Sequence, residues 1–257
     1  MANRTILNDF YDKLKDLLVK LGIENRPDLI WNCDETGLSY VAKPSKIVTA
    51  IGKMYVYKKS YADRGENHTM LACINASGHW ISPVIIFKGI RMSDDLHNDK
   101  LPGTLIKLSA KCWMNSDIFL EWFNNFIVSI PPARPVILLM NSHASHVSEG
   151  VINLAKASEV FILTFPSHTI HLLQLLNVGV YRPFKQAWGK SLSNHTTQSP
   201  GQKPKRSDFH RLMKPAFYSA FSPETIISSF RKTGIYPFNP SALTDDAIST
   251  SKLTEKN

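Results

Sequence analysis

The 257-residue sequence has few cysteines and lacks the long apolar runs of membrane proteins. Cys33, Cys73 and Cys112 stand alone, without a CxxC pair, and their odd number fits a reducing compartment rather than a disulfide framework. No apolar run approaches the roughly 18 residues that a membrane-spanning helix needs. The opening residues, MANRTILNDF, contain no apolar stretch typical of a secretory signal. These absences predict a cytosolic or nuclear protein without a membrane partner.

Negative charge is also scarce. Lys and Arg total 30 against 21 Asp and Glu, which gives a net charge of +9 and a pI near 9.4. A basic surplus favours polyanionic partners, nucleic acid above all, because their binding releases condensed counterions. A basic protein without such a partner has the same composition, so charge alone leaves both interpretations open. With 43% hydrophobic residues, the chain is long enough for one sizeable core or two small ones.

Hydrophobic periodicity predicts alternating strands and helices. An amphipathic helix covers Leu7 to Leu21 and ends at Gly22. The predicted strands are Leu29–Cys33, Met70–Asn75, Val84–Phe87, Val136–Met140 and Val160–Thr164, and further helices are predicted at 116–130, 149–158, 178–192 and from Ser222. We expect an N-terminal helix leading into the domain (1–28), a core domain (29–192), a basic linker or loop (193–207), a C-terminal helical extension (208–243) and a flexible tail (244–257).

The order of these elements indicates an α/β fold. Three sequential strands followed by two helix-linked, continuously apolar strands match a mixed five-stranded sheet of the RNase H type, flanked by helices. In such a sheet, Asp34 ends the first strand, Asn141 follows the fourth, and Asn177 opens the helix after the fifth. Reactive groups gather where strands end at a shared edge, so we expect these three side chains to converge.

Several motifs in a fixed order resemble the DDE catalytic domain of pogo/Tigger-type transposases, the group that includes jerky-like proteins and centromere protein B. The matching stretches are NCDETG (32–37), RGEN (64–67), PVIIFKG (83–89), WMNS (113–116), LLMNSHASH (138–146), PSHTIHLLQLLNVGVYRPFK (166–185) and TGIYPFNP (233–240). They run across nearly the whole chain, and their joint order is far more specific than any one of them.

This resemblance implies an RNase H-like fold in which three acidic ligands hold two divalent ions, Mg²⁺ or Mn²⁺, for chemistry at a DNA phosphate. Asp34 matches the first ligand, whereas Asn141 and Asn177 stand where the family has Asp. An amide offers one neutral oxygen, and one remaining carboxylate compensates two divalent ions poorly. We therefore expect a degenerate site in which Asp34 alone remains of the metal ligands, no bound cofactor, and no useful transposition or nicking.

Replacement of the lost carboxylates by neighbours is not expected. Glu35 follows Asp34 directly and so points to the opposite face of an extended strand, and Glu149 lies on the next helix. The family pattern places further polar residues around the site, which we expect to surround the triad rather than bind metal: Glu35, His143, His146, His168, His171 and Gln174. The four histidines also permit a zinc site as an alternative.

Basic residues suggest a surface that follows the phosphate backbone with little base preference. The candidates are Lys43, Lys46, Lys53, Lys58, Lys59, Arg64, Lys203, Lys205 and Arg206, and a solvated face is the alternative. The helix-turn-helix modules of the family have no room before Asp34, so sequence-specific recognition is not expected.

Three hypotheses follow from the sequence. The first is a nuclear, transposase-derived, catalytically inactive protein that binds DNA non-specifically. The second is a weakly active metal-dependent endonuclease, and the third is a module for homo-oligomerisation or for docking chromatin proteins.

Overall fold

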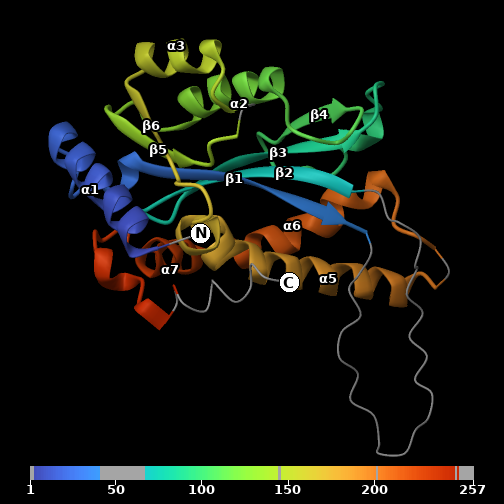
Figure 1. Ribbon diagram of the computed structural model, residues 1–257. Coiled ribbons are helices and arrows are strands. Elements are labelled where there is room, and N and C mark those ends of the chain that lie inside the picture. The colour runs from blue at the N-terminus through green and yellow to red at the C-terminus, as the bar shows by residue number, and fades with distance from the viewer. Residues whose placement is uncertain (1–2, 41–66, 144–145, 201, 247, 249–257) are drawn as a thin grey trace, which may run out of the picture.

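A six-stranded mixed sheet forms the centre of the protein (Figure 1). The structure is a computed structural model that describes residues 3–40, 67–143, 146–200, 202–246 and 248. In the order β4-β3-β2-β1-β5-β6, the sheet contains β1 (Ile30–Ser39), β2 (Asn67–Asn75), β3 (Trp80–Lys88), β4 (Leu105–Ser109), β5 (Val136–Met140) and β6 (Val160–Thr164). The first three strands form an antiparallel meander, while β4 runs parallel to β3, β5 to β1, and β6 to β5.

Helices cover both faces of this sheet. They are α1 (Arg4–Leu21), α2 (Ser116–Ser129), α3 (Glu149–Ala157), the short α4 (Ile170–Leu173), α5 (Tyr181–Gln198), α6 (Phe209–Ala220) and α7 (Pro223–Lys232). In Figure 1, α2 and α3 lie above the sheet and α5 and α6 below it, with α1 at one side. The RNase H-like α/β architecture predicted from the sequence is therefore confirmed.

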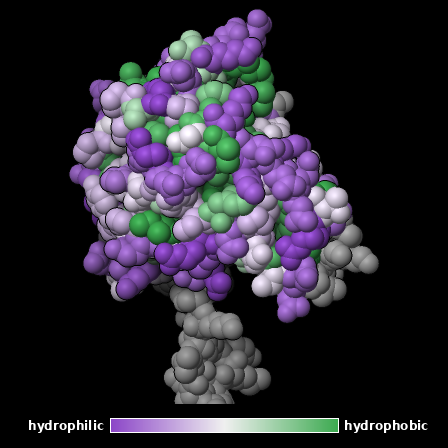
Figure 2. All heavy atoms as spheres, turned by 90° about the vertical axis from the view of Figure 1, so that its left-hand side faces the viewer, coloured by the Kyte–Doolittle hydropathy of each residue, from purple (hydrophilic) through white to green (hydrophobic). Residues whose placement is uncertain are grey.

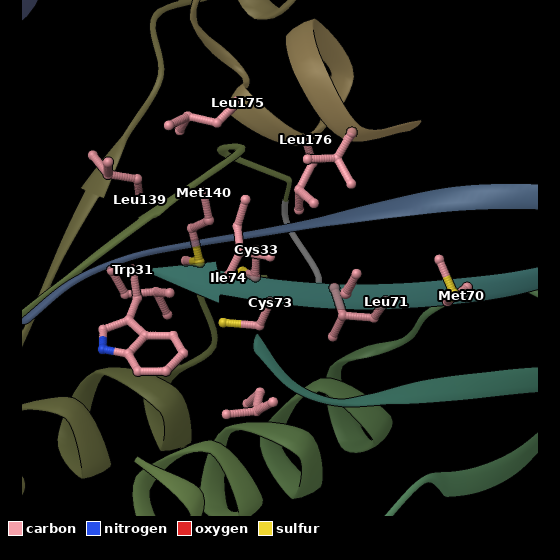
Figure 3. Packing of buried hydrophobic residues seen from close by; sticks show 14 of the residues in the cluster. Trp31, Cys33, Met70, Leu71, Cys73, Ile74, Leu139, Met140, Leu175 and Leu176 are labelled. Carbon is pink, nitrogen blue, oxygen red and sulfur yellow. The ribbon is translucent and has the colours of Figure 1, made fainter. Parts of the chain in front are cut away.

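The core lies between the sheet and these helices. Successive side chains of a strand face opposite ways, and Trp31 of β1 packs edge-on against Phe126 of α2, with ring centroids 5.8 Å apart. Figure 3 shows Trp31 and Cys73 directed to this side, whereas Leu175 and Leu176 approach the sheet from the other. Together with Phe126, these four residues are almost fully buried. The odd-numbered residues of β1 thus face α2, which leaves Asp34 facing the opposite layer.

Helix α1 contacts described residues near the C-terminal end of the chain on one side of the domain. Asn3 caps the N-terminus of α1, because its side chain accepts the Ile6 amide, and Gly22 caps the C-terminus in a left-handed conformation. Its Tyr11 hydroxyl donates to the Thr233 carbonyl at 2.6 Å, beyond the end of α7. Arg4 pairs with Asp245 at 2.6 Å, so this part of the predicted tail contacts the domain. On the side shown in Figure 2, hydrophilic side chains predominate and hydrophobic ones form separate small patches.

Two predictions made from sequence need correction. The sheet has six strands rather than five, because Leu105–Ser109 adds β4 beside β3. The helix predicted to end at Leu192 continues to Gln198, so the connection to the next helix is shorter than the predicted linker 193–207. Leu192 and His195 of this segment are buried, so packing against the domain keeps it helical although it is polar, and the hydroxyls of Thr196 and Thr197 donate to carbonyls four residues earlier.

Among the described residues, no helix is long and apolar enough to cross a membrane.

Candidate active site

The centre of the candidate site lies beside the end of β5. β1 pairs with β5 only from Ile30 to Asn32, so it extends past the point where β5 ends at Met140. Asp34 lies within β1 (Ile30–Ser39), not at its end as predicted, because β1 continues to pair with β2 as far as Ser39, and Asn141 follows β5 directly. The predicted convergence of these two side chains is what the structure shows, because Asn141 Nδ2 lies 3.0 Å from Asp34 Oδ1.

Asn177 reaches the same carboxylate from the helical layer. It lies in a π-helical turn (Leu176–Val180) between α4 and α5, not at the first turn of a regular helix as expected. Its Nδ2 donates to Asp34 Oδ2 at 2.8 Å. The π-turn is held against α7, where a Cβ on Gly179 would come within 2.4 Å of Ser229 Cβ. The C-terminal helices therefore support the segment that carries Asn177.

The two amides cap the Asp34 carboxylate at both oxygens. Asn141 donates to Oδ1 and Asn177 donates to Oδ2, so each oxygen of this carboxylate accepts a side-chain amide. We call this arrangement the amide cap. Gln174 fixes its orientation, because its Nε2 donates at 3.3 Å both to Asn141 Oδ1 and to the Cys33 carbonyl. With Oδ1 of Asn141 accepting from Gln174, the amide nitrogen of Asn141 is left to face Asp34.

Burial governs the electrostatics of this carboxylate. Asp34 is 6% exposed, and burial raises its pKa to about 7, with the charge of Glu35 acting in the same direction. The hydrogen bond from Asn177 lowers the pKa, but by less than burial raises it. The last acidic member of the triad therefore lies in surroundings that disfavour its negative charge.

These residues do not fit a pair of divalent ions. Such ions require anionic oxygen, yet two of the three positions present amide N–H groups to the remaining carboxylate. Each oxygen of Asp34 therefore has one of its lone-pair directions taken by an amide N–H. Within the described part of the chain, no group of three or more His, Cys, Asp or Glu side chains is placed to hold a metal ion, which also argues against the zinc alternative.

Glu35 and His146 form a separate contact on the other face of β1. His146 Nε2 lies 2.9 Å from Glu35 Oε1, its Nδ1 lies 3.3 Å from the Asn141 carbonyl, and its ring stacks on Phe119 of α2 at 4.3 Å. Glu35 thus points away from Asp34, as predicted, and is held by a hydrogen bond to His146 rather than offered to the triad. His146 joins the two faces by bracing the backbone of Asn141.

The other predicted histidines are less closely attached to the site. His143 is exposed, with its ring centroid 5.5 Å from that of His146. His168 and His171 are exposed near α4, and neither is among the described donors to Asp34. Gln174 contacts a side chain of the triad, that of Asn141, whereas His146 contacts the Asn141 backbone.

The predicted basic surface is described only in part. Lys43, Lys46, Lys53, Lys58, Lys59 and Arg64 lie outside the described residues. Lys203, Lys205 and Arg206 lie in the connection from α5 to α6, where the Tyr40 hydroxyl donates to the Lys205 carbonyl at 3.2 Å. Arg206 approaches the end of β3, because a Cβ on Gly89 would lie 3.7 Å from Arg206 Nη1.

Two residues that support the site were not predicted. The Tyr181 hydroxyl donates to the Asp34 carbonyl at 2.6 Å, and Trp188 Nε1 donates to the Ser39 carbonyl at 2.9 Å. Both project from α5 and are buried. Both residues follow Asn177 at helical spacing within YRPFKQAW, so the helix that carries them was predictable. Their hydrogen-bond partners were not, because a buried hydroxyl or indole N–H does not identify its acceptor from sequence.

Comparisons with known proteins agree with this geometry. The chain matches the DDE superfamily endonuclease family over residues 66–230. It is 24% identical to the human (Homo sapiens) "Pogo transposable element with KRAB domain" over 217 residues, covering 79% of this chain and 35% of the relative. It is 30% identical over 184 residues to the "MFS-type transporter clz9" of Cochliobolus lunatus, covering 67% of this chain and 19% of that protein. The chain thus spans about a fifth to a third of these curated relatives.

Solved structures with the same fold come from the Mos1 transposase. A pre-cleavage Mos1 transpososome gives a TM-score of 0.60 at 12% identity, covering 98% of this chain and 64% of the Mos1 chain. The Mos1 mariner catalytic domain gives 0.53 at 12% identity, covering 98% and 96%. At this identity the likeness shows the fold. Together with the family match, it establishes that the chain belongs to the DDE superfamily endonucleases, as a pogo-type DDE domain.

Proposed function

We propose that this chain is a nucleic-acid-binding DDE domain that no longer cleaves DNA and that acts in the nucleus. The observation that carries the proposal is the amide cap, in which both oxygens of Asp34 accept amide donors from the positions of the missing carboxylates. The family chemistry needs anionic oxygens there, and uncompensated divalent charge is costly to hold in a buried site. Each tenfold loss in metal affinity is about 1.4 kcal/mol, and two lost anionic ligands amount to several such steps.

The charge pattern around the site favours a polyanion. Between Glu159 and Asp208 the sequence contains neither Asp nor Glu, although it contains six basic residues. Arg182, Lys185 and Lys190 are exposed on α5, which begins directly after the turn that carries Asn177. An acid-free helical face beside the capped carboxylate is suited to phosphate contacts that carry no base information.

Solved structures of similar proteins also support an association with DNA. Solved Mos1 structures of this fold include a transpososome and a paired-end complex with a left transposon end. We extend the association with DNA to this chain, and with it a nuclear location. Self-association or docking of chromatin proteins on the same domain is compatible with this role.

Catalytic loss is tested by incubating the chain with supercoiled plasmid and Mg²⁺ or Mn²⁺. We expect no nicked or linear product, with or without a chelator. Metal-dependent nicking that disappears in Asp34→Ala would overturn the proposed inactivity and assign the chain to the weakly active endonucleases instead.

Binding is tested separately with a labelled duplex of arbitrary sequence. We expect affinity to fall steeply with salt and to be unchanged by a chelator. Replacing Arg182, Lys185 and Lys190 with Ala removes up to three phosphate contacts, which lowers the slope of log affinity against log salt by roughly 0.9 per contact. The matched control replaces Lys13, Lys15 and Lys20, exposed on α1, with Ala. Equal losses in both variants would show that binding follows net charge and not the α5 face, and no binding by the unmodified chain would favour the protein-docking hypothesis.

A further inference from the structure

A cluster of exposed basic and apolar side chains lies where β3 and β4 end. Lys88, the last residue of β3, pairs with Ser109 of β4, and the Gly89 amide donates to the Ser109 carbonyl at 3.1 Å. Because the two strands are parallel, the segments that follow them leave the sheet at the same edge. We call their exposed side chains the Trp113 patch: Lys88, Ile90, Arg91, Met92, Lys111 and Trp113.

The tryptophan is the unusual member of this patch. Trp113 is 70% exposed, whereas Trp31, Trp122 and Trp188 are at most 4% exposed, and Trp80 is half-buried. A large aromatic side chain left in water forgoes the free energy of burial. Ile90, just after the end of β3, is 89% exposed, and exposed large apolar side chains that gather on a surface mark interaction sites.

The backbone that carries Trp113 is well anchored. The preceding residue, Cys112, has a left-handed φ of 60°, and its amide donates to the Ser109 carbonyl at 3.1 Å. Its thiol donates to the Ile86 carbonyl at 2.9 Å, and its own carbonyl accepts the Thr69 hydroxyl at 2.7 Å. The turn is thus tied to both β2 and β3. An indole presented on a fixed backbone loses little conformational freedom when a partner binds.

The charges of the patch are of one sign. Lys88, Arg91 and Lys111 are exposed, and none of them forms an ion pair with a carboxylate in the described part of the chain. The three cations lie in the stretches 67–93 and 100–116, which have neither Asp nor Glu; the exposed Asp94 and Asp95 follow the first stretch and Asp117 follows the second. Three cations around an apolar centre favour a polyanionic partner.

We propose that the Trp113 patch is a binding site for single-stranded nucleic acid. One base stacks on the indole of Trp113, and Lys88, Arg91 and Lys111 contact the flanking phosphates. Exposed aromatic faces combined with cations are the means by which proteins hold single strands without reading sequence. A duplex keeps its bases stacked on each other, so it offers the indole no free face. The proposal rests on the nucleic-acid binding proposed above, but it places the single strand on the β3–β4 edge rather than on α5.

Intrinsic fluorescence tests this site directly, because Trp113 is far more exposed than the other tryptophans. Titrating the 257-residue chain with oligothymidylate is expected to quench its tryptophan emission. Trp113→Phe should remove the quenching while most of the affinity remains, since phenylalanine also stacks. Trp113→Ala should weaken binding of the oligonucleotide by roughly 5- to 150-fold, the range for one stacked base. The matched control is Val128→Ala on α2, where an apolar side chain is 80% exposed.

Each outcome separates this inference from the proposed function. If the chain binds duplex but oligothymidylate binds Trp113→Ala as tightly as the unmodified chain, the patch is not a single-strand site. If Trp113→Ala instead abolishes self-association in sedimentation and leaves oligonucleotide binding unchanged, the patch is a protein contact and the inference is wrong. If the unmodified chain binds neither duplex nor single strand, the proposed function fails together with it.

Discussion

Returning the two amides to carboxylates should make the fold depend on divalent metal. In a chain with both Asn141→Asp and Asn177→Asp, two hydrogen bonds of 3.0 and 2.8 Å to Asp34 become contacts between like charges. At these separations each ionised pair costs about 5 kcal/mol at an effective dielectric constant of about 20. Protonation of one or more carboxyl groups relieves part of this cost, so we expect a net loss of about 3 kcal/mol without metal.

The assay is thermal unfolding in chelator and in Mn²⁺ or Mg²⁺. A loss of about 3 kcal/mol corresponds to a melting temperature lower by roughly 6 to 12 °C for a domain of this size. Mn²⁺ should restore most of this loss, because an ion that binds the folded state stabilises it. The unmodified chain should melt at the same temperature in both solutions, since its carboxylate is already capped by amides.

The control adds the same two charges elsewhere. Asn98→Asp with Asn153→Asp changes two exposed asparagines and should show no response to metal. The reasoning is refuted if the double variant at 141 and 177 melts like the unmodified chain in chelator. It is also refuted if metal stabilises the unmodified chain as much as the variant.

Three further predictions concern stability. Burial lowers the pKa of His210 to about 4, below its unfolded value near 6.5. The contribution of the neutral side chain to folding stability is therefore fully present above pH 6.5 and is lost as pH falls towards 4. His210→Leu should reduce this acid-dependent loss by at most about 3 kcal/mol, measured by urea unfolding at several pH values. Gly179→Ala should destabilise the chain by about 1–3 kcal/mol in the same assay, because its Cβ would lie 2.4 Å from that of Ser229. Tyr11→Phe should cost about 1 kcal/mol or more by leaving the buried Thr233 carbonyl without its donor, and an unchanged unfolding midpoint would contradict this.

The sequence predicted the sheet where its strands are long or continuously apolar. β5 and β6 were predicted with the bounds that the structure has, Val136–Met140 and Val160–Thr164. β4 was missed because Leu105–Ser109 is short, contains a lysine, and lies at the edge of the sheet beside β3. Such a strand carries little periodicity of its own and is defined by pairing with a neighbour distant in sequence.

The candidate site was likewise predictable only in part. The predicted strand order placed Asp34 beside Asn141, although Asp34 lies within β1 rather than at its end, and family resemblance brought in Asn177. The amide cap itself was not predictable, because it depends on which way each amide turns, and Gln174 decides this for Asn141 through a contact across 33 residues. His168 and His171 were predicted from the family pattern alone, and the structure leaves them exposed near α4.

Three side chains from the segment after β6 attach it to the backbone of β1. Gln174, Tyr181 and Trp188 donate to the carbonyls of Cys33, Asp34 and Ser39. None of these bonds involves the triad side chains, so exchanging carboxylates for amides leaves the attachment intact. The attachment of this segment to β1 therefore does not depend on whether positions 141 and 177 carry amides or carboxylates.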